Sequence, residues 1–151
     1  PKELIKKIKK ASTFNQGFAT VEYLASALVD MKLHLLPNPN VDPKKFEAET
    51  LKKLKMPKEI VMRHRIPQFG HVFSGEGYAA GYYSYMWSDV LRHDAFKAFR
   101  EAKGPYDKKV AERFQKHILS VGNTIDPAEA YRKFRGRDPQ VGALLESKGF
   151  R

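Results

Sequence analysis

The sequence contains no cysteine among its 151 residues. Without thiols the chain can form no disulfide and can offer no thiolate ligand to a metal ion. A cysteine-free sequence fits a reducing compartment, so we expect a cytoplasmic protein. No apolar run reaches the length that a bilayer span needs, and no membrane partner is expected.

The sequence also lacks an initiator methionine and a signal peptide at its start. Pro1-Lys2-Glu3-Leu4 instead looks like a cut in the middle of a larger sequence. The chain is still long enough to bury a core, and its apolar content of 42% is ordinary for a globular protein. We therefore expect one domain over residues 1–151.

Several catalytic motifs are missing. There is no Gly-x-Ser-x-Gly elbow, no phosphate-binding loop and no His-Glu-x-x-His pair that would hold zinc on a helix. For His34, His93 and His117 we expect packing or surface roles, whereas His71 adjoins a glycine-bearing loop. The sequence therefore offers hydrogen-bond donors for a site, but no nucleophile and no metal ligands of its own.

The net charge is +11, which raises the alternative of a basic helical module that binds nucleic acid. The lysines and arginines are dispersed, however, with their densest runs over residues 6–10 and 52–55. Isoleucine or leucine interrupts both runs at helical spacing. This pattern favours the solvated faces of amphipathic helices over a phosphate-binding surface.

Apolar spacing and cap signals predict an all-α, mainly helical fold. Asp42-Pro43, Asp126-Pro127 and Asp138-Pro139 each have the form of an N-cap followed by the first residue of a helix. Asp94 is expected to cap a continuation of the helix before it, and residues 60–72 are expected to be a loop with a short extended piece. Helices are expected over approximately residues 4–12, 14–34, 42–54, 77–91, 94–103, 107–121, 126–134 and 138–149.

The expected helix over residues 14–34 is apolar on more than one face. One stripe includes Phe14, Phe18 and Leu28, and a neighbouring stripe runs from Leu24 to Leu35. So broad an apolar surface predicts a helix that packs on more than one side. If part of this surface belongs against helices that the chain lacks, we expect self-association or marginal stability.

Residues 77–87 hold four of the seven tyrosines and the only tryptophan. In a helix, Tyr78, Tyr82 and Tyr85 would share one face and could donate several hydrogen bonds into a cleft. The simpler interpretation is an aromatic stripe that packs in a core. A core rarely needs three hydroxyls on one face, because each buried hydroxyl requires a partner. The preceding loop, residues 71–77, also suits a mobile wall over a site.

The sequence resembles the C-terminal end of the thimet oligopeptidase family, the zinc metallopeptidases of the oligopeptidase A and bacterial peptidyl-dipeptidase type. The resemblance covers nearly the whole chain, and the tyrosine run is its most specific part. It implies that residues 1–151 are the C-terminal part of a zincin-like helical catalytic domain whose HEXXH half is absent here. The matching stretches are residues 14–23, 71–77, 77–90, 126–131 and 134–137, with Leu144-Leu145.

The resemblance implies a role for several of these residues. Tyr85 matches the tyrosine that hydrogen-bonds the oxyanion of the tetrahedral intermediate, and Tyr82 matches a third phenol on the same face. His71 matches the histidine of a loop that closes over substrate, while Tyr78, with Gly77 beside it, matches the substrate-gripping position. A neutral phenol placed where charge develops stabilises the transition state more than the substrate, so the chemistry agrees with these roles.

In the intact parent, the resemblance implies a zinc ion that the HEXXH helix and a downstream glutamate hold, and no metal ligand in this chain. The expected function is that of a fragment of a zinc-dependent oligopeptidase or dipeptidyl carboxypeptidase. Its expected partners are short peptide substrates and the missing N-terminal part of the same enzyme. The isolated chain is expected to be inactive. A pure interaction or structural unit is a further alternative, in which no activity depends on the tyrosines.

Overall fold

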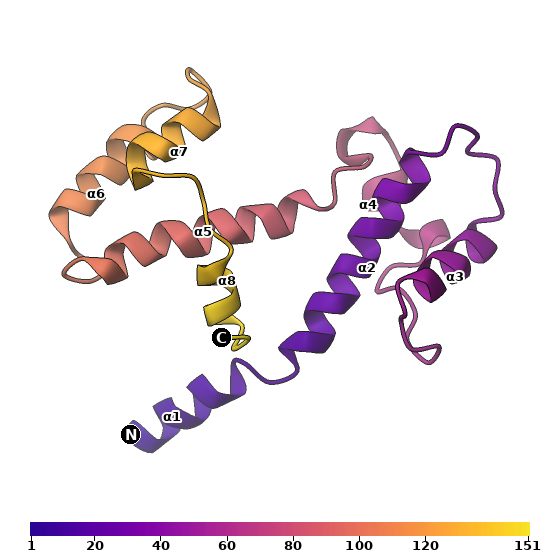
Figure 1. Ribbon diagram of the computed structural model, residues 1–151, viewed down its shortest axis with the longest axis horizontal. Coiled ribbons are helices and arrows are strands. Elements are labelled where there is room, and N and C mark those ends of the chain that lie inside the picture. Colours follow the sequence, from indigo (N-terminus) through magenta and orange to yellow (C-terminus); the bar gives the residue numbers. More distant parts are fainter. The chain divides into compact units, whose positions relative to one another are not determined.

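The computed structural model describes residues 1–151 and contains helices but no strand, so the all-α prediction is confirmed. None of the helices combines the length and apolarity of a membrane span. The chain divides into two compact units, which are described separately. We call residues 14–85 the tyrosine unit, and residues 1–13 with 86–151 the terminal unit (Figure 1).

The tyrosine unit is organised on the long helix α2, which ends at the residue that the sequence predicted and begins two residues later. The predicted N-cap of α3 is also confirmed, because the Asp42 side chain accepts a hydrogen bond from the Lys45 N–H and Pro43 is the first helical residue. Helix α3 lies beside α2 (Figure 1). The elements are α2 (Gln16–His34), α3 (Pro43–Lys53), η1 (Ile66–Gln68), α4 (Gly70–Phe73) and η2 (Glu76–Tyr78).

The core of the tyrosine unit uses a narrow face of α2 made of small residues. Ala25 and Val29 are buried there, with Leu51, Met62, Ile66, Phe69, Val72 and Tyr82 from other elements. The broad stripe that includes Phe14 and Leu28 is exposed instead, and Phe14 is 82% exposed. Alanine lets the neighbouring segments approach the α2 backbone closely. Of the two predicted stripes the unit buries Ala25, whereas Leu24, Leu28 and Leu35 of the second stripe are exposed as well.

The predicted helix over residues 77–91 is wrong in its first half. Residues 76–78 form η2, a turn follows, and α5 (Ser84–Glu101) begins only at Ser84. Ala80 has a φ of 56°, which a right-handed helix does not allow. The backbone N–H groups of Ala80 and Tyr82 donate to the Asp30 carboxylate, so they are not available to helical carbonyls.

The segment over residues 60–72 also differs from its prediction as a loop with an extended piece. It contains the short helical elements η1 and α4 and no extended strand. The buried Glu47 carboxylate accepts the Ile66 N–H at 3.1 Å and pairs with Arg65. Glu47 of α3 thus holds the backbone where η1 begins, and the periodicity of the segment itself could not indicate this contact.

The terminal unit contains α1 and the helices after Tyr85. As predicted, Asp126 is an N-cap, and its side chain accepts a hydrogen bond from the Glu129 N–H. Asp107, where a helix was expected to begin, is also an N-cap, and its side chain accepts a hydrogen bond from the Val110 N–H. Helix α6 packs against α7 (Figure 1). The elements are α1 (Lys2–Ala11), most of α5, α6 (Lys108–Phe114), the π-helical segment η3 (Gln115–Leu119), α7 (Pro127–Arg135) and α8 (Gly142–Ser147).

Two expected helix starts in the terminal unit are wrong. Asp94 caps nothing, because α5 is continuous and the Asp94 carboxylate accepts hydrogen bonds from Tyr131 and Arg137 instead. The last helix begins at Gly142 rather than after Asp138, whose side chain accepts a hydrogen bond from Arg132. In both cases a side chain from elsewhere in the terminal unit binds the carboxylate that was expected to cap a helix.

Candidate functional site

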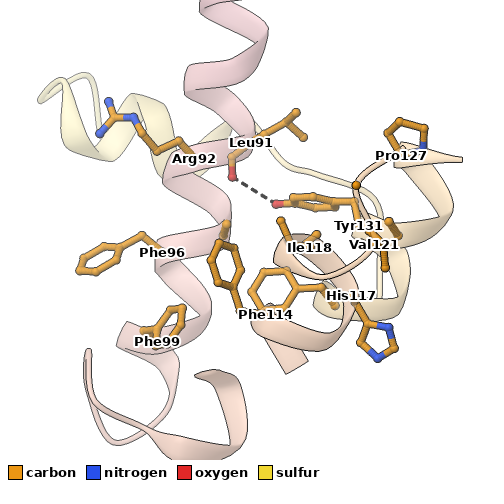
Figure 2. Close-up of a pocket in the computed structure, with 14 residues that line it drawn as sticks. Leu91, Arg92, Phe96, Phe99, Phe114, His117, Ile118, Val121, Pro127 and Tyr131 are labelled. Atoms are coloured by element: carbon orange, nitrogen blue, oxygen red, sulfur yellow. Dashed lines mark hydrogen bonds between the residues drawn. The ribbon is translucent and has the colours of Figure 1, made fainter. Parts of the chain in front are cut away.

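The terminal unit carries an apolar groove of about 610 Å³ between α5, η3 and α7. Figure 2 shows that its wall is formed mainly by aromatic and aliphatic side chains, with the Tyr131 hydroxyl donating to the Leu91 carbonyl. The Arg92 guanidinium points away from the aromatic side chains (Figure 2). The groove thus brings no set of polar groups together, and we do not assign the chemistry to it.

The tyrosine unit carries a smaller and more polar hollow of about 420 Å³. It combines two imidazoles and two phenols, which are groups that can donate or accept hydrogen bonds toward a ligand. We call this hollow the tyrosine site. Its lining residues are His64, Gln68, Phe69, Gly70, His71, Tyr82 and Tyr85.

His71 is the residue around which the phenols gather. Its Nε2 atom lies 2.9 Å from the Tyr85 hydroxyl oxygen, and the ring of Tyr78 stacks on the imidazole with centroids 4.3 Å apart. The Tyr82 ring meets that of Tyr85 edge-on, with centroids 5.6 Å apart. The structure therefore brings Tyr78, Tyr82 and Tyr85 together, although they do not lie on one continuous helix.

The turn before α5 determines where these phenols lie. The Gly81 N–H donates to the Tyr78 carbonyl at 2.9 Å, and Ala80 has a positive φ at the third position. These are the features of a type II turn. A Cβ at position 81 would lie 3.2 Å from the Tyr78 carbonyl oxygen, so glycine permits the close approach there. Helix α5 then starts at Ser84, three residues after Gly81, and carries Tyr85 in its first turn.

The three phenols differ in exposure. Tyr78 and Tyr85 are 47% and 44% exposed, whereas Tyr82 is 8% exposed and belongs to the core of its unit. Desolvation, followed by the neighbouring Tyr78 and Tyr82, raises the pKa of the Tyr85 phenol above its ordinary value. Tyr85 therefore remains protonated at neutral pH and can act as a hydrogen-bond donor.

Sequence reasoning named some of the residues at this site and missed others. Gly77 and Tyr78 lie next to each other in η2, and neither lines the hollow, although the Tyr78 ring stacks on His71. His64, Gln68, Phe69 and Gly70 also line the hollow and were missed, because the short helical elements η1 and α4 were not predicted there. Asp30 was missed as well, although an acid on the small-residue face of an apolar helix is an unusual feature that could have indicated it.

The residues of this chain do not fit a zinc site. No group of three or more His, Cys, Asp or Glu side chains is placed so that it could hold a metal ion. His64 and His71 both line the tyrosine site, but no third ligand joins them. A zinc site needs at least three protein ligands in the common catalytic arrangements.

Comparison with known proteins gives consistent matches along the chain. Residues 1–150 match the family described as Peptidase family M3. Oligopeptidase A from Salmonella typhimurium is 38% identical over 155 residues, covering 100% of this chain and 22% of that protein. Dipeptidyl carboxypeptidase from Escherichia coli is 37% identical over 153 residues, covering 99% of this chain and 22% of that protein.

A more distant relative is saccharolysin from Saccharomyces cerevisiae, which is 27% identical over 157 residues. That match covers 99% of this chain and 21% of saccharolysin. The chain thus spans about a fifth of the length of the relatives that it matches.

Proposed function

Because the chain belongs to peptidase family M3, we propose that it forms the substrate-binding and oxyanion-stabilising side of a peptidase site in a longer protein. In this proposal residues 1–151 are the C-terminal part of a catalytic domain, and the substrates are short peptides. The relatives named oligopeptidase A and dipeptidyl carboxypeptidase support this class of substrate. The observation that carries the proposal is the contact between His71 and Tyr85 at the edge of the tyrosine site.

Tyr85 is the proposed oxyanion donor. Hydrolysis of a peptide bond places negative charge on the former carbonyl oxygen, and a fixed donor aimed at that oxygen lowers the barrier. The Tyr85 phenol is half-exposed, and like any phenol with a pKa at or above 10.0 it carries its proton at neutral pH. In this proposal His71 Nε2–H donates to the Tyr85 hydroxyl oxygen across the 2.9 Å contact, which orients the phenol and leaves its own proton free for the oxyanion.

The other residues contribute to binding in this proposal. Tyr78 is exposed and stacked on His71, so its ring can contact a peptide that enters the site. Gly77, next to it, has no side chain, and open space surrounds the position of a Cβ there. Tyr82 lines the hollow but is largely buried, so it acts from the wall of the site.

No group of side chains in this chain could hold the zinc ion that the resemblance implies. The chain spans about a fifth of its relatives' length, and we propose that the remainder of the longer protein holds the ion. We also propose a cytoplasmic location, on the absence of cysteine alone. A nucleic-acid-binding role rests only on the net charge of +11, and the names of the relatives describe peptidases instead.

The proposal is tested by Tyr85→Phe in the longer protein. This substitution removes one hydroxyl and should lower kcat for a short peptide by roughly 10²- to 10³-fold, the usual effect of losing an oxyanion donor. KM should change little, because the donor acts mainly in the transition state. The matched control is Tyr83→Phe, since Tyr83 is exposed and does not line the site. Unchanged kcat in Tyr85→Phe would contradict the proposed role.

A further inference from the structure

Two side chains of α2 bind both backbone polar groups of Tyr82. The Tyr82 N–H donates to Asp30 Oδ2 at 2.9 Å, and the Tyr82 carbonyl accepts a hydrogen bond from the Tyr23 hydroxyl. Tyr23 and Asp30 are seven residues apart, so they lie on the same face of the helix, two turns from each other. The rings of Tyr23 and Tyr82 also stack, with centroids 5.0 Å apart.

Asp30 makes a second bond to the same turn. Its Oδ1 atom accepts the Ala80 N–H at 3.0 Å, so one carboxylate binds two backbone donors that are two residues apart. Ala80 has a φ of 56°, a conformation that residues with a Cβ rarely adopt unless the surrounding structure holds them in it. The Asp30 carboxylate supplies that constraint.

Burial of the Asp30 carboxylate carries a desolvation cost in free energy. The residue is 1% exposed and lies on the α2 face that buries Ala27 and Val29. A buried carboxylate is tolerated only where hydrogen bonds or opposite charges compensate it. Here its partners are the two N–H groups of the turn and His34, whose Nδ1 atom lies 2.8 Å from Oδ1. A packing role alone would be filled by an apolar residue.

The turn that Asp30 holds leads directly into the tyrosine site. Helix α5 begins at Ser84, two residues after Tyr82, and Tyr85 lies in the first turn of that helix. A shift of the backbone at Ala80 and Tyr82 would therefore move the start of α5. It would change the distance between the Tyr85 hydroxyl and His71, which belongs to α4 on the other side of the hollow.

We propose that Asp30 and Tyr23 are positioning residues of the tyrosine site, which hold the turn over residues 78–82 and thereby place Tyr85 against His71. This inference rests on the proposed function, because it assigns to α2 the ordering of the oxyanion donor. It adds two residues that do not line the hollow and that act through the backbone of another segment.

The main test is Asp30→Asn in the longer protein. Asparagine has one acceptor oxygen, and its amide NH₂ would face one of the two backbone donors, so one bond is lost. Amide hydrogen exchange at Ala80 and Tyr82 should accelerate by about ten- to a hundredfold, as expected for losing a hydrogen bond to a charged group. For a short peptide, kcat should fall by a similar factor, with a smaller change in KM.

The matched control is Asp94→Asn. Asp94 is also 1% exposed and hydrogen-bonded, but its partners are Tyr131 and Arg137 in the terminal unit. This variant should lose stability while exchange at Ala80 and Tyr82 stays at the wild-type rate. A rescue variant further separates an effect on the position of Tyr85 from a general loss of stability. Glycine adopts positive φ without strain, so adding Ala80→Gly to Asp30→Asn should restore part of kcat.

Tyr23→Phe provides an independent test, and it replaces Asp30→Asn if that variant does not fold. It removes the hydroxyl that donates to the Tyr82 carbonyl and leaves both Asp30 bonds in place, so it should accelerate exchange over residues 80–82 and lower kcat to a smaller extent. Wild-type exchange in either folded variant would overturn the proposal. If Tyr85→Phe has a lowered kcat, then accelerated exchange with an unchanged kcat in Asp30→Asn or Tyr23→Phe would also overturn the proposal. Should Tyr85→Phe itself be fully active, the proposed function fails, and exchange alone decides whether α2 holds the turn.

Discussion

The Nε2 atom of His71 lies 2.9 Å from the hydroxyl oxygen of Tyr85, across 14 residues of sequence. On a single continuous helix, residues 14 positions apart would be separated by about 21 Å. The turn between α4 and the first residues of α5 brings the two side chains together. The imidazole also carries the stacked ring of Tyr78. His71 thus connects the exposed phenol that can touch a ligand with the phenol that we propose as the oxyanion donor.

His71→Phe should therefore reduce activity less than Tyr85→Phe. Phenylalanine can keep the stacking with Tyr78 but has no ring nitrogen for the Tyr85 hydroxyl. In the longer protein, we expect kcat for a short peptide to fall about tenfold, the factor that corresponds to a typical single hydrogen bond. His117→Phe is the control, because His117 lies in the terminal unit outside the tyrosine site. A larger effect in the control than in His71→Phe would contradict the prediction.

The Asp94 carboxylate should make the stability of the terminal unit depend on acid pH. Burial alone would raise the pKa of Asp94, but hydrogen bonds from Arg137 and Tyr131 hold it below its ordinary value of 3.8. Its stabilising contribution is therefore present above that value and is lost as the pH falls through the lower folded-state pKa. Asp94→Asn should lower the free energy of unfolding at pH 7 by about 3 kcal/mol, as for breaking a buried ion pair.

Urea unfolding at pH 7 and at pH 3 measures this effect. The difference between wild type and Asp94→Asn should shrink at the lower pH. Asp89→Asn is the matched control, because Asp89 lies on the same helix and pairs with Arg92 at the surface. That exposed pair contributes at most about 1 kcal/mol. Equal losses in the two variants would show that the Asp94 cluster adds nothing beyond a surface pair.

The parts of the fold that depend on local chemistry were predictable from the sequence. Asp42, Asp107 and Asp126 bind backbone N–H groups three residues ahead, so the capping signal and its partner lie within one turn. The family resemblance was likewise readable, because the tyrosine run is unusual in composition, and the match over residues 1–150 confirms it.

The predictions that were wrong concern segments whose hydrogen-bond partners lie far away in the sequence. The helix expected from Gly77 does not form because Asp30, 50 residues before Ala80, binds the N–H groups of the turn. Asp94 was interpreted as a cap, but Arg137, 43 residues later, binds its carboxylate within a continuous helix. The apolar periodicity of a short segment does not indicate a partner so far away in the sequence. The three phenols do lie close together, but a turn brings them there rather than the single helix that was expected.

The exposed apolar face of α2 should make the isolated 151-residue chain associate with itself. Phe18 and Leu28 are exposed along this face, and Phe14 just before the helix is 82% exposed. Soluble monomers rarely leave so continuous an apolar surface in contact with water. Sedimentation velocity over a wide range of protein concentration should therefore show a mass that rises with concentration.

A pair of variants identifies the face that associates. Phe18→Gln with Leu28→Gln should shift the chain toward monomer, because both side chains are exposed and neither belongs to the core of the tyrosine unit, which uses Ala25 and Val29 of α2. The control pair, Leu119→Gln with Val141→Gln, changes two exposed apolar residues of the terminal unit and should leave association intact. A wild-type chain that stays monomeric at every concentration would show that the α2 face is tolerated in water, and that its apolar residues need no covering helices.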